Sequence, residues 1–405
     1  MPAIVDFPEL VHQQVAQYGD LFANEPERRH FAEYLTGLYV AERKNVSGIN
    51  REFAVTTDQS CLNRWLTEVA WEVSKLNERR LELLQRDSST RWTPWGSIPL
   101  DNTLIDHDGK LIEDVGWFWD HADKRHLIAH DYLIINYVCS SGKHYPLEFR
   151  RFRKRETCEA EGTPFANHTE LACELIDWVI AHDIPGTFTF DSYFTNAEVL
   201  NHIHLKQRVY VGDMKLNRKI EVGGQERKLS EWGASLPKDA RHPITINGKT
   251  QYWFSKSVRL PKVKHPVRLV LLWRDKDASE PHKVLVTNRT FWELTRILKA
   301  YRHRWTGTET FHRDGTQHLG MGECQLRNGD GQTRHMYLVF LAYSAIMTEL
   351  RQARPQEWAQ EMLTTVGQAC RTMSREVLGK TIAWVVERTE EGWSLPKIKA
   401  HLALV

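Results

Sequence analysis

The chain has 405 residues, of which 41% are hydrophobic and 26% are charged, and its formal net charge is +2. This is the composition of a soluble globular protein of two or three domains, and the small net charge excludes a strongly basic overall surface. The six cysteines form no CxxC pair, which argues against a zinc ribbon or a disulfide framework and favours a reducing cytoplasm. The N-terminus lacks a signal-peptide pattern, and the longest apolar run, Tyr337–Met347, is too short to cross a bilayer.

Residues 1–92 are predicted to be helical, because apolar residues such as Leu62, Trp65 and Leu66 recur at helical spacing. Within this part, residues 42–53 resemble a helix-turn-helix with its turn at Gly48. Its basic side chains could reach DNA phosphates, and a plain helical bundle with a basic rim is the alternative. These side chains are Arg43, Lys44, Arg51 and Arg64.

From residue 93 the hydrophobic period changes to that of strands. Residues 98–105 are predicted to form a strand with Asp101 in its middle, and residues 130–139 and 145–152 are predicted to pair with it in antiparallel fashion. A helix at 167–182 with Asn167 as its cap, a short strand that leads into Asp191, a helix at 195–204 and a strand at 209–212 follow. Residues 93–214 are therefore expected to form a mixed α/β sheet.

Residues 215–290 contain many short β-like runs and are predicted to be a β-rich insertion. Between Lys249 and Arg304 there are 14 basic and four acidic residues, interleaved with Tyr252, Trp253 and Trp273. Basic and aromatic residues mixed in this way are typical of a surface that binds a nucleic-acid backbone. A solvated β face is the alternative.

Residues 301–320 combine aromatic and basic residues with a single glutamate at helical spacing. If they form one helix, Glu309, His312 and Thr316 share a face, with Tyr301 and Trp305 near it. An amphipathic helix that only packs on the core is the alternative. Residues 291–350 are expected to complete the sheet domain, and residues 351–405 to form a helical tail.

Three carboxylates stand out by their position: Asp101 inside a strand, Asp191 at the end of another, and Glu309 on a late helix. An ionised carboxylate in a strand core is costly unless a cation compensates it. Divalent ions such as Mg²⁺ are held by one or two carboxylates together with substrate phosphate oxygens, and a pair of such ions supports phosphoryl transfer.

This arrangement resembles the DDE transposases of bacterial insertion sequences. The resemblance rests on two strand-borne aspartates, a β-rich insertion, a helix-borne glutamate, a Tyr-x-x-Arg motif at Tyr301 and Arg304, and the runs 308–320 and 331–335. It implies an RNase H-like α/β core between a helical DNA-binding domain and a helical tail. It also implies a cytoplasmic, nucleoid-associated bacterial enzyme that cuts double-stranded DNA at the ends of an insertion sequence, joins the ends to target DNA, and acts as a homodimer in the DNA complex.

The resemblance implies that Asp101, Asp191 and Glu309 hold two Mg²⁺ or Mn²⁺ ions. It implies that Tyr301 and Arg304 bind a DNA phosphate and that a tryptophan, for which Trp253 is the candidate, stacks on a flipped base; a tryptophan of the β core is the alternative for Trp253. The further candidate DNA contacts are Arg302, His312, Arg313, Lys44 and Arg51. The sequence departs from the family signature in two places. Its lysine falls at Thr316, for which Arg313 is a candidate replacement, and the interval between Arg304 and Glu309 is one residue longer. A transposase-derived protein that binds DNA and cuts it poorly is therefore the alternative.

Overall fold

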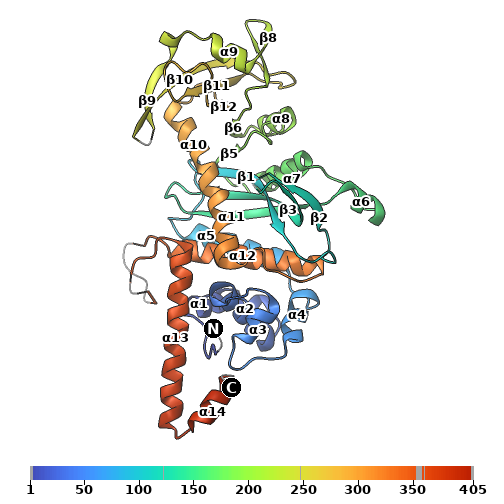
Figure 1. Cartoon of the computed structure of the whole chain (residues 1–405), viewed down its shortest axis with the longest axis vertical. Helices are drawn as coiled ribbons and strands as arrows, with labels where there is room; N and C mark the ends of the chain where they lie inside the picture. The colour runs from blue at the N-terminus through green and yellow to red at the C-terminus, as the bar shows by residue number, and fades with distance from the viewer. Residues whose placement is uncertain (1–2, 122, 247, 353–357, 360, 403–405) are drawn as a thin grey trace.

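The computed structural model describes residues 3–121, 123–246, 248–352, 358–359 and 361–402. Figure 1 shows three parts along the long axis of the molecule: terminal helices at one end, a sheet with its covering helices in the middle, and a β-rich part at the other end. Within the described residues, no helix is long and apolar enough to cross a membrane.

The N-terminal part is helical, as predicted. Gly37 lies against Ile49, where a Cβ would come within 2.4 Å of the isoleucine side chain, so the second and third helices cross closely. The turn predicted at Gly48 is wrong: Gly48 lies inside the third helix, which Asn45 caps, and the missing side chain leaves room for the carbonyl oxygen of Arg43. The helices are α1 (Glu9–Tyr18), α2 (Glu25–Val40), α3 (Val46–Arg51), α4 (Gln59–Thr67) and α5 (Val73–Arg86).

The middle part is built on a mixed sheet. The strands β1 (Ser97–Asp106), β3 (Arg125–Val138) and β4 (His144–Phe152) form the predicted antiparallel meander. The strands β5 (Thr187–Phe190) and β6 (Val209–Asp213) continue the sheet in parallel with β1. The helix α7 (His168–Ala181) begins at Asn167 with a capping box, as predicted, and α8 (Ala197–Leu205) follows β5. Two further elements were not predicted: β2 (Gly116–Asp120), on the outer edge of β3, and α6 (Arg155–Glu161).

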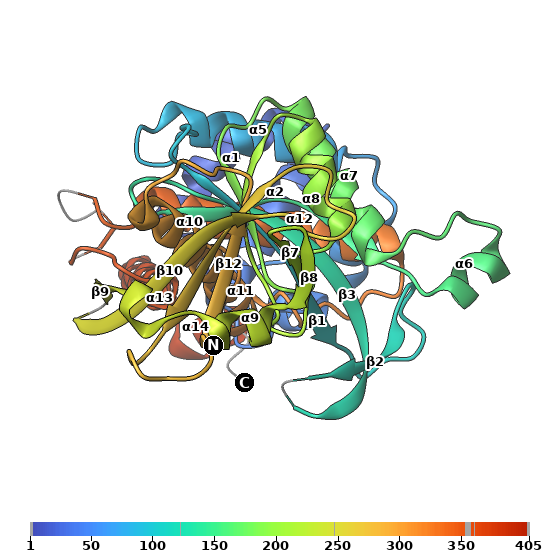
Figure 2. The ribbon, with the colours of Figure 1, turned by 90° about the horizontal axis from the view of Figure 1, so that it is seen from above.

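The β-rich part extends the same sheet, because its strand β12 pairs with β6. Figure 2 shows its strands above the core, with β2 and the adjoining end of β3 projecting to one side. The order along the sheet is β2-β3-β1-β5-β6-β12-β11-β10-β9, and β7 and β8 form a separate ribbon. The elements of this part are β7 (Lys219–Val222), β8 (Gln225–Lys228), α9 (Leu229–Ser235), β9 (His242–Ile246), β10 (Lys249–Val258), β11 (Val267–Trp273) and β12 (Lys283–Thr287).

The remaining helices return the chain from the β-rich part to the N-terminal helices (Figure 1). The helix α12 packs on β4 and on the N-terminal helices, where Tyr34 and His335 form a buried hydrogen bond of 2.8 Å. Burial lowers the pKa of His335 to about 4, so this ring is neutral at pH 7. The helices are α10 (Leu294–Gly307), α11 (Glu309–Leu319), α12 (Gly329–Glu349), α13 (Val366–Glu390) and α14 (Leu395–His401).

Candidate active site

Two of the three singled-out carboxylates lie on neighbouring strands. The last paired residues of the parallel strands β1 and β5 are Leu100 and Phe190, and each is followed directly by an aspartate, Asp101 and Asp191. Adjacent strands lie about 4.8 Å apart, so the two aspartates stand side by side at one end of β5. The Oδ1 atom of Asp191 accepts backbone N–H groups from Tyr193 at 2.8 Å and Phe194 at 3.3 Å, which fixes the carboxylate at the strand end.

The junction of α10 and α11 brings the glutamate to this end of the sheet. Gly307 lies directly on the sheet, because a Cβ there would come within 2.5 Å of Pro99 and 2.8 Å of Val138. Since side chains alternate along a strand, Pro99 and Asp101 face the same side, and α10 covers it. Glu309 follows two residues after Gly307, at the start of α11.

The stretch from Arg304 to Glu309 contains the junction of two helices. Residues 301–320 form two successive helices, α10 and α11, separated at Thr308, whose φ of −102° and ψ of −70° distort the helix although the N–H groups of Thr308 and His312 still donate to the carbonyl oxygens four residues earlier. The helical face expected for Glu309, His312 and Thr316 therefore lies within the single helix α11.

Arg304 lies among the carboxylates. Its Nη1 atom is 2.7 Å from Oδ2 of Asp101 and 3.9 Å from Oε1 of Glu309. Burial raises the pKa of Asp101 to about 7, the charge of Arg304 opposes this rise, and the charges of Asp191 and Glu309 add to it. The three carboxylates thus repel one another in a partly buried site, and a guanidinium offsets part of that repulsion.

The donor set suits a hard divalent cation, because carboxylate oxygens in a crowded, partly buried cluster are the ligands that Mg²⁺ and Mn²⁺ prefer. In the part of the chain that the structure describes, however, no three acidic, histidine or cysteine side chains converge closely enough to coordinate one ion. Arg304 is the cation that contacts Asp101 instead. The buried Nε atom of Arg304 and the Nε2 atom of His312 have no hydrogen-bond partner among the described residues, so polar groups next to the carboxylates remain unsatisfied.

A second polar cluster on the opposite face of the sheet was not anticipated from the sequence. The buried Asp131 on β3 accepts a hydrogen bond of 3.2 Å from Nδ2 of Asn102 and lies 2.7 Å from Nε2 of His168 on α7. The ring of His168 stacks on Phe152 at 4.0 Å and meets the edge of Tyr193 at 5.8 Å. The residue after Asp101 is therefore held on the α7 face, while Asp101 itself faces α10. The sequence signal that could have found this cluster is Asp131 itself, since an aspartate in a buried strand needs a polar partner.

The other residues of the 301–320 stretch lie at different depths. Tyr301 is half-buried, with Nζ of Lys283 4.8 Å above its ring, and Arg302 is exposed. His312 has a buried ring, and burial lowers its pKa to about 4, so it presents no positive charge at pH 7. Arg313 is exposed and pairs with Asp314 at 2.9 Å. Thr316, at the position of the family's lysine, is also exposed.

The proposed DNA contacts outside this stretch are spread across the molecule. Lys44 is buried, and its ammonium group donates to the carbonyl oxygen of Ala41 at 2.7 Å, so it closes the C-terminal end of α2. Arg51 is exposed on α3. Trp253 on β10 is half-buried in a cluster with Val270, Leu272 and other apolar residues. These three assignments remain predictions.

Comparison with known families gives two matches. A model described as "DDE superfamily endonuclease" matches residues 17–245, more than half of the chain, and a model described as "Transposase DDE domain" matches residues 164–345. The first range contains Asp101 and Asp191, and the second contains Asp191 and Glu309. No curated protein gives a significant match over the chain.

Proposed function

The chain belongs to the DDE superfamily of endonucleases and transposases, which cleave DNA and transfer strands during transposition, and we propose that its acidic triad is Asp101, Asp191 and Glu309. The observation that carries this proposal is the register of β1 and β5, which sets Asp101 beside Asp191. The approach of Gly307 to β1 adds Glu309 to the same end. We propose further that the sheet around β1, β5 and β6 is an RNase H-like core.

In this proposal Asp101, Asp191 and Glu309 would hold two divalent cations, and such ions would supply activation of a water and stabilisation of a leaving oxygen. The protein's own part is to fix the carboxylates on rigid elements. Asp101 and Asp191 are held by strand pairing, and Asp191 also by two backbone N–H groups. Arg304 contacts Oδ2 of Asp101 at 2.7 Å, so its guanidinium occupies an oxygen that a cation would use. Turned away from Asp101, the guanidinium would be able to bind a DNA phosphate, which is the role that the resemblance implies.

We propose the domain limits expected from the sequence: 1–92 for DNA binding, 93–214 and 291–350 for the catalytic core, 215–290 for the insertion and 351–405 for the tail. The exposed basic residues of the insertion support a DNA-binding surface there, since charges of one sign attract the phosphate backbone. They include Lys256, Arg259, Lys262 and Lys264.

The experiment that tests the proposed function uses a plasmid that carries this gene with its native flanking DNA. We expect double-strand cuts at the two ends of the element, followed by joining to target DNA, in Mg²⁺ or Mn²⁺ and not in excess EDTA. The products are mapped by sequencing the cut ends and the new junctions.

Two results would change the proposal. A folded protein that binds the element ends but cuts them in neither metal is an inactive, DNA-binding descendant. Cutting without joining indicates a nuclease that is not a transposase. Thr316 stands at the position of the family's lysine and is exposed. The first result, binding without cutting, is therefore the one that the experiment most needs to exclude.

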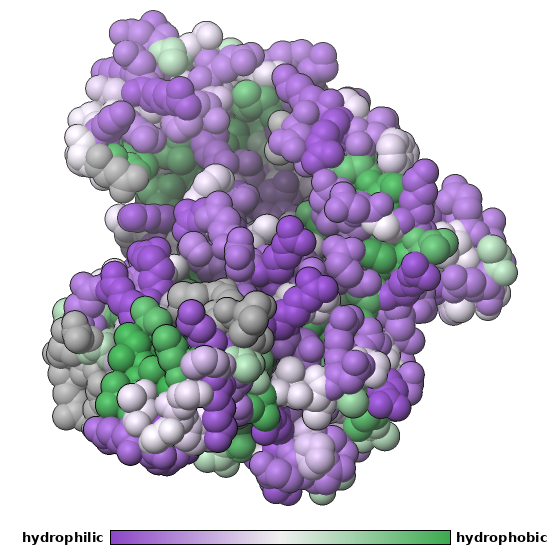
Figure 3. All heavy atoms as spheres, turned by 60° about the horizontal axis from the view of Figure 1, so that its bottom comes forward, coloured by the Kyte–Doolittle hydropathy of each residue, from purple (hydrophilic) through white to green (hydrophobic). Residues whose placement is uncertain are grey.

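We also propose that the enzyme acts as a homodimer through α13. This helix carries exposed apolar residues at a spacing of four, Leu378, Ile382 and Val386. They belong to the apolar surface over α13 at the lower left of Figure 3. On the same face, Arg375 precedes the apolar residues and Glu390 follows them, and both are exposed. A second copy of α13 packed antiparallel covers the apolar residues and sets the basic end of each helix against the acidic end of the other.

The prediction is that Ile382→Asp converts a dimer into a monomer, because it places a charge at the centre of the apolar face. The molar mass in solution, with and without end DNA, is measured by light scattering. Leu205→Asp is the matched control, since Leu205 is an exposed aliphatic residue on α8 and should leave the mass unchanged. Arg375→Glu alone should weaken the dimer, and the double variant Arg375→Glu/Glu390→Arg should restore it. A wild type that stays monomeric on DNA, or an Ile382→Asp variant that stays dimeric, contradicts this interface.

A further inference from the structure

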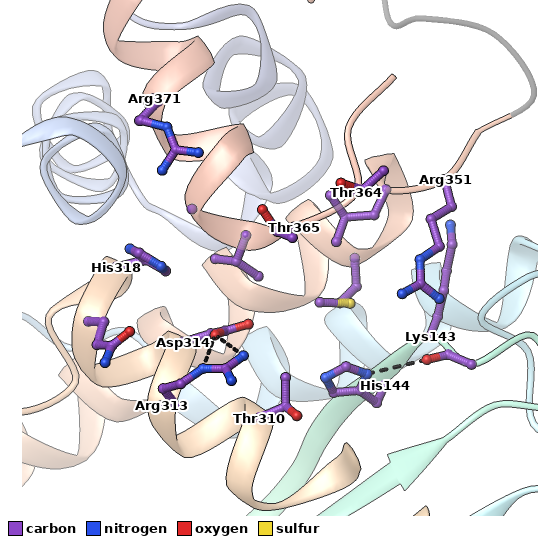
Figure 4. A pocket seen from close by; sticks show the side chains of 16 residues that line it. Lys143, His144, Thr310, Arg313, Asp314, His318, Arg351, Thr364, Thr365 and Arg371 are labelled. Carbon is purple, nitrogen blue, oxygen red and sulfur yellow. Dashed lines mark hydrogen bonds and ion pairs between the residues drawn. The ribbon is translucent and has the colours of Figure 1, made fainter. Parts of the chain in front are cut away.

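A cavity of about 400 Å³ lies between α11, the end of α12, the start of α13 and the turn that joins β3 to β4. Figure 4 shows the side chains that line it, with Arg313 and Asp314 on α11, Lys143 on the turn and His144 at the start of β4, Arg351 beside Lys143, and Arg371 on α13 at the other end of the cavity. The proposed chemistry at Asp101, Asp191 and Glu309 uses none of these groups except Arg313.

The walls of the cavity are strongly cationic. Four of the lining residues are Lys or Arg, and Asp314 is the one Asp or Glu among the residues that line it. Asp314 is already paired, since its Oδ1 atom accepts from Nε and Nη2 of Arg313 at 3.0 and 2.9 Å. Within the described residues, Arg351 and Arg371 form no ion pair, and both are exposed. Burial lowers the pKa of Lys143, whose ammonium group donates to the carbonyl oxygen of Thr348 at 2.9 Å.

The cavity also offers backbone and hydroxyl donors to an anion. Val366 and Gly367, in the first turn of α13, line it, and N–H groups in the first turn of a helix have no intrahelical partner. The hydroxyl of the N-cap residue Thr365 lines it as well, whereas the N–H and hydroxyl of Thr364 already donate to Oε1 of Gln368 at 2.8 and 3.1 Å. Guanidinium groups together with helical N–H groups form a donor set that matches the tetrahedral oxygens of a phosphate.

The cavity lies along the same helix, α11, that carries Glu309. Arg313 and Gln317 line it and follow Glu309 by four and eight residues on α11, so all three lie along one side of that helix. With a rise of about 1.5 Å per residue, Arg313 lies about 6 Å and Gln317 about 12 Å beyond Glu309 along the axis. We propose that this cavity binds a backbone phosphate of the DNA strand near the cut, with Arg351 and Arg371 as its main ligands. This inference rests on the proposed function and adds a phosphate site that the family signature does not contain.

The test is the affinity for a labelled duplex carrying an element end, measured for the full chain at several salt concentrations in EDTA, without cutting. The double variant Arg351→Gln/Arg371→Gln should bind about tenfold more weakly at moderate salt, and its plot of log affinity against log salt should be shallower by about one unit. Arg155→Gln is the matched control, because Arg155 is exposed on α6, away from the cavity, and should leave both quantities unchanged. The circular dichroism spectrum and melting temperature confirm that each variant folds.

A second measurement distinguishes DNA from a free anion. Inorganic phosphate and a deoxynucleoside monophosphate are titrated into the wild type and into the double variant by calorimetry. Weak millimolar binding that the variant loses is the expected result. Micromolar binding of either small anion, with an unchanged DNA affinity in the variant, would assign the cavity to a small molecule and overturn the proposal. A folded double variant that binds DNA like the wild type would overturn it too.

These outcomes are separable from those of the proposed function. If the wild type cuts element ends and the double variant binds them normally, the cavity inference fails alone. If the wild type never cuts, but the double variant still loses affinity and salt dependence, the phosphate site stands in a protein that binds DNA without cutting it.

Discussion

Asp191→Asn is expected to reduce cutting at element ends by roughly 10³-fold, equivalent to about 4 kcal/mol of transition-state stabilisation. The substitution keeps an oxygen acceptor for the N–H groups of Tyr193 and Phe194, so the end of β5 should keep its shape. It removes one negative charge from the carboxylates that are proposed to hold the cations. The readout is the single-turnover rate of cutting in Mg²⁺ on a preformed protein–DNA complex.

Binding of the element ends by Asp191→Asn should stay within about threefold of the wild type, because the change removes a negative charge and no DNA contact. Asp183→Asn is the control for the substitution itself. Asp183 is exposed in the loop before β5, and its φ of 51° is one that asparagine tolerates. An Asp191→Asn variant that cuts at more than a tenth of the wild-type rate would remove Asp191 from the proposed triad.

The local signals in the sequence were sufficient for much of this fold. Runs of β-forming residues placed β1, β3 and β4, and Asn167 as a cap residue placed the start of α7, where the structure adds a capping box with Glu170. The strand β2 was missed because Trp117 and Trp119 are exposed, so its apolar side does not face a core. The continuation of the sheet into the insertion was also missed, since it depends on pairing between β6 and β12, more than 70 residues apart.

The site was predictable in its residue types but not in its geometry. A carboxylate inside a strand marked Asp101 and a carboxylate at the end of a strand marked Asp191, yet only the parallel register of β1 and β5 sets them side by side. The contact of Arg304 with Asp101 joins residues 203 positions apart, and nothing local distinguishes Arg304 from the exposed Arg302. The partner of Asp131 could not be predicted from local sequence either, because His168 belongs to a helix that packs on the other face of the sheet.

Gly307→Ala should lower both the stability of the protein and its rate of cutting. Helix propensity alone predicts the opposite, since alanine stabilises a helix interior by about 1 kcal/mol relative to glycine. At this position the added Cβ would lie 2.5 Å from Cγ of Pro99 and 2.8 Å from Cγ2 of Val138, two side chains on paired strands that cannot easily withdraw. The junction of α10 and α11 must therefore move outward. We expect a net loss of about 1–3 kcal/mol in the free energy of unfolding.

The same outward movement carries Glu309 away from Asp101 and Asp191, which are fixed to the sheet. A displacement of about 1 Å in a catalytic group can cost about 10² in rate, so cutting should fall by that factor while DNA binding changes little. Chemical denaturation and single-turnover cutting measure the two effects. Gly379→Ala on α13, studied at concentrations below self-association, is the matched control, because a Cβ there meets nothing within 4 Å and should only stabilise the helix. If Gly307→Ala stabilises the protein as the control does, α10 does not lie on β1 as closely as the structure has it, and the placement of Glu309 in the triad loses its support.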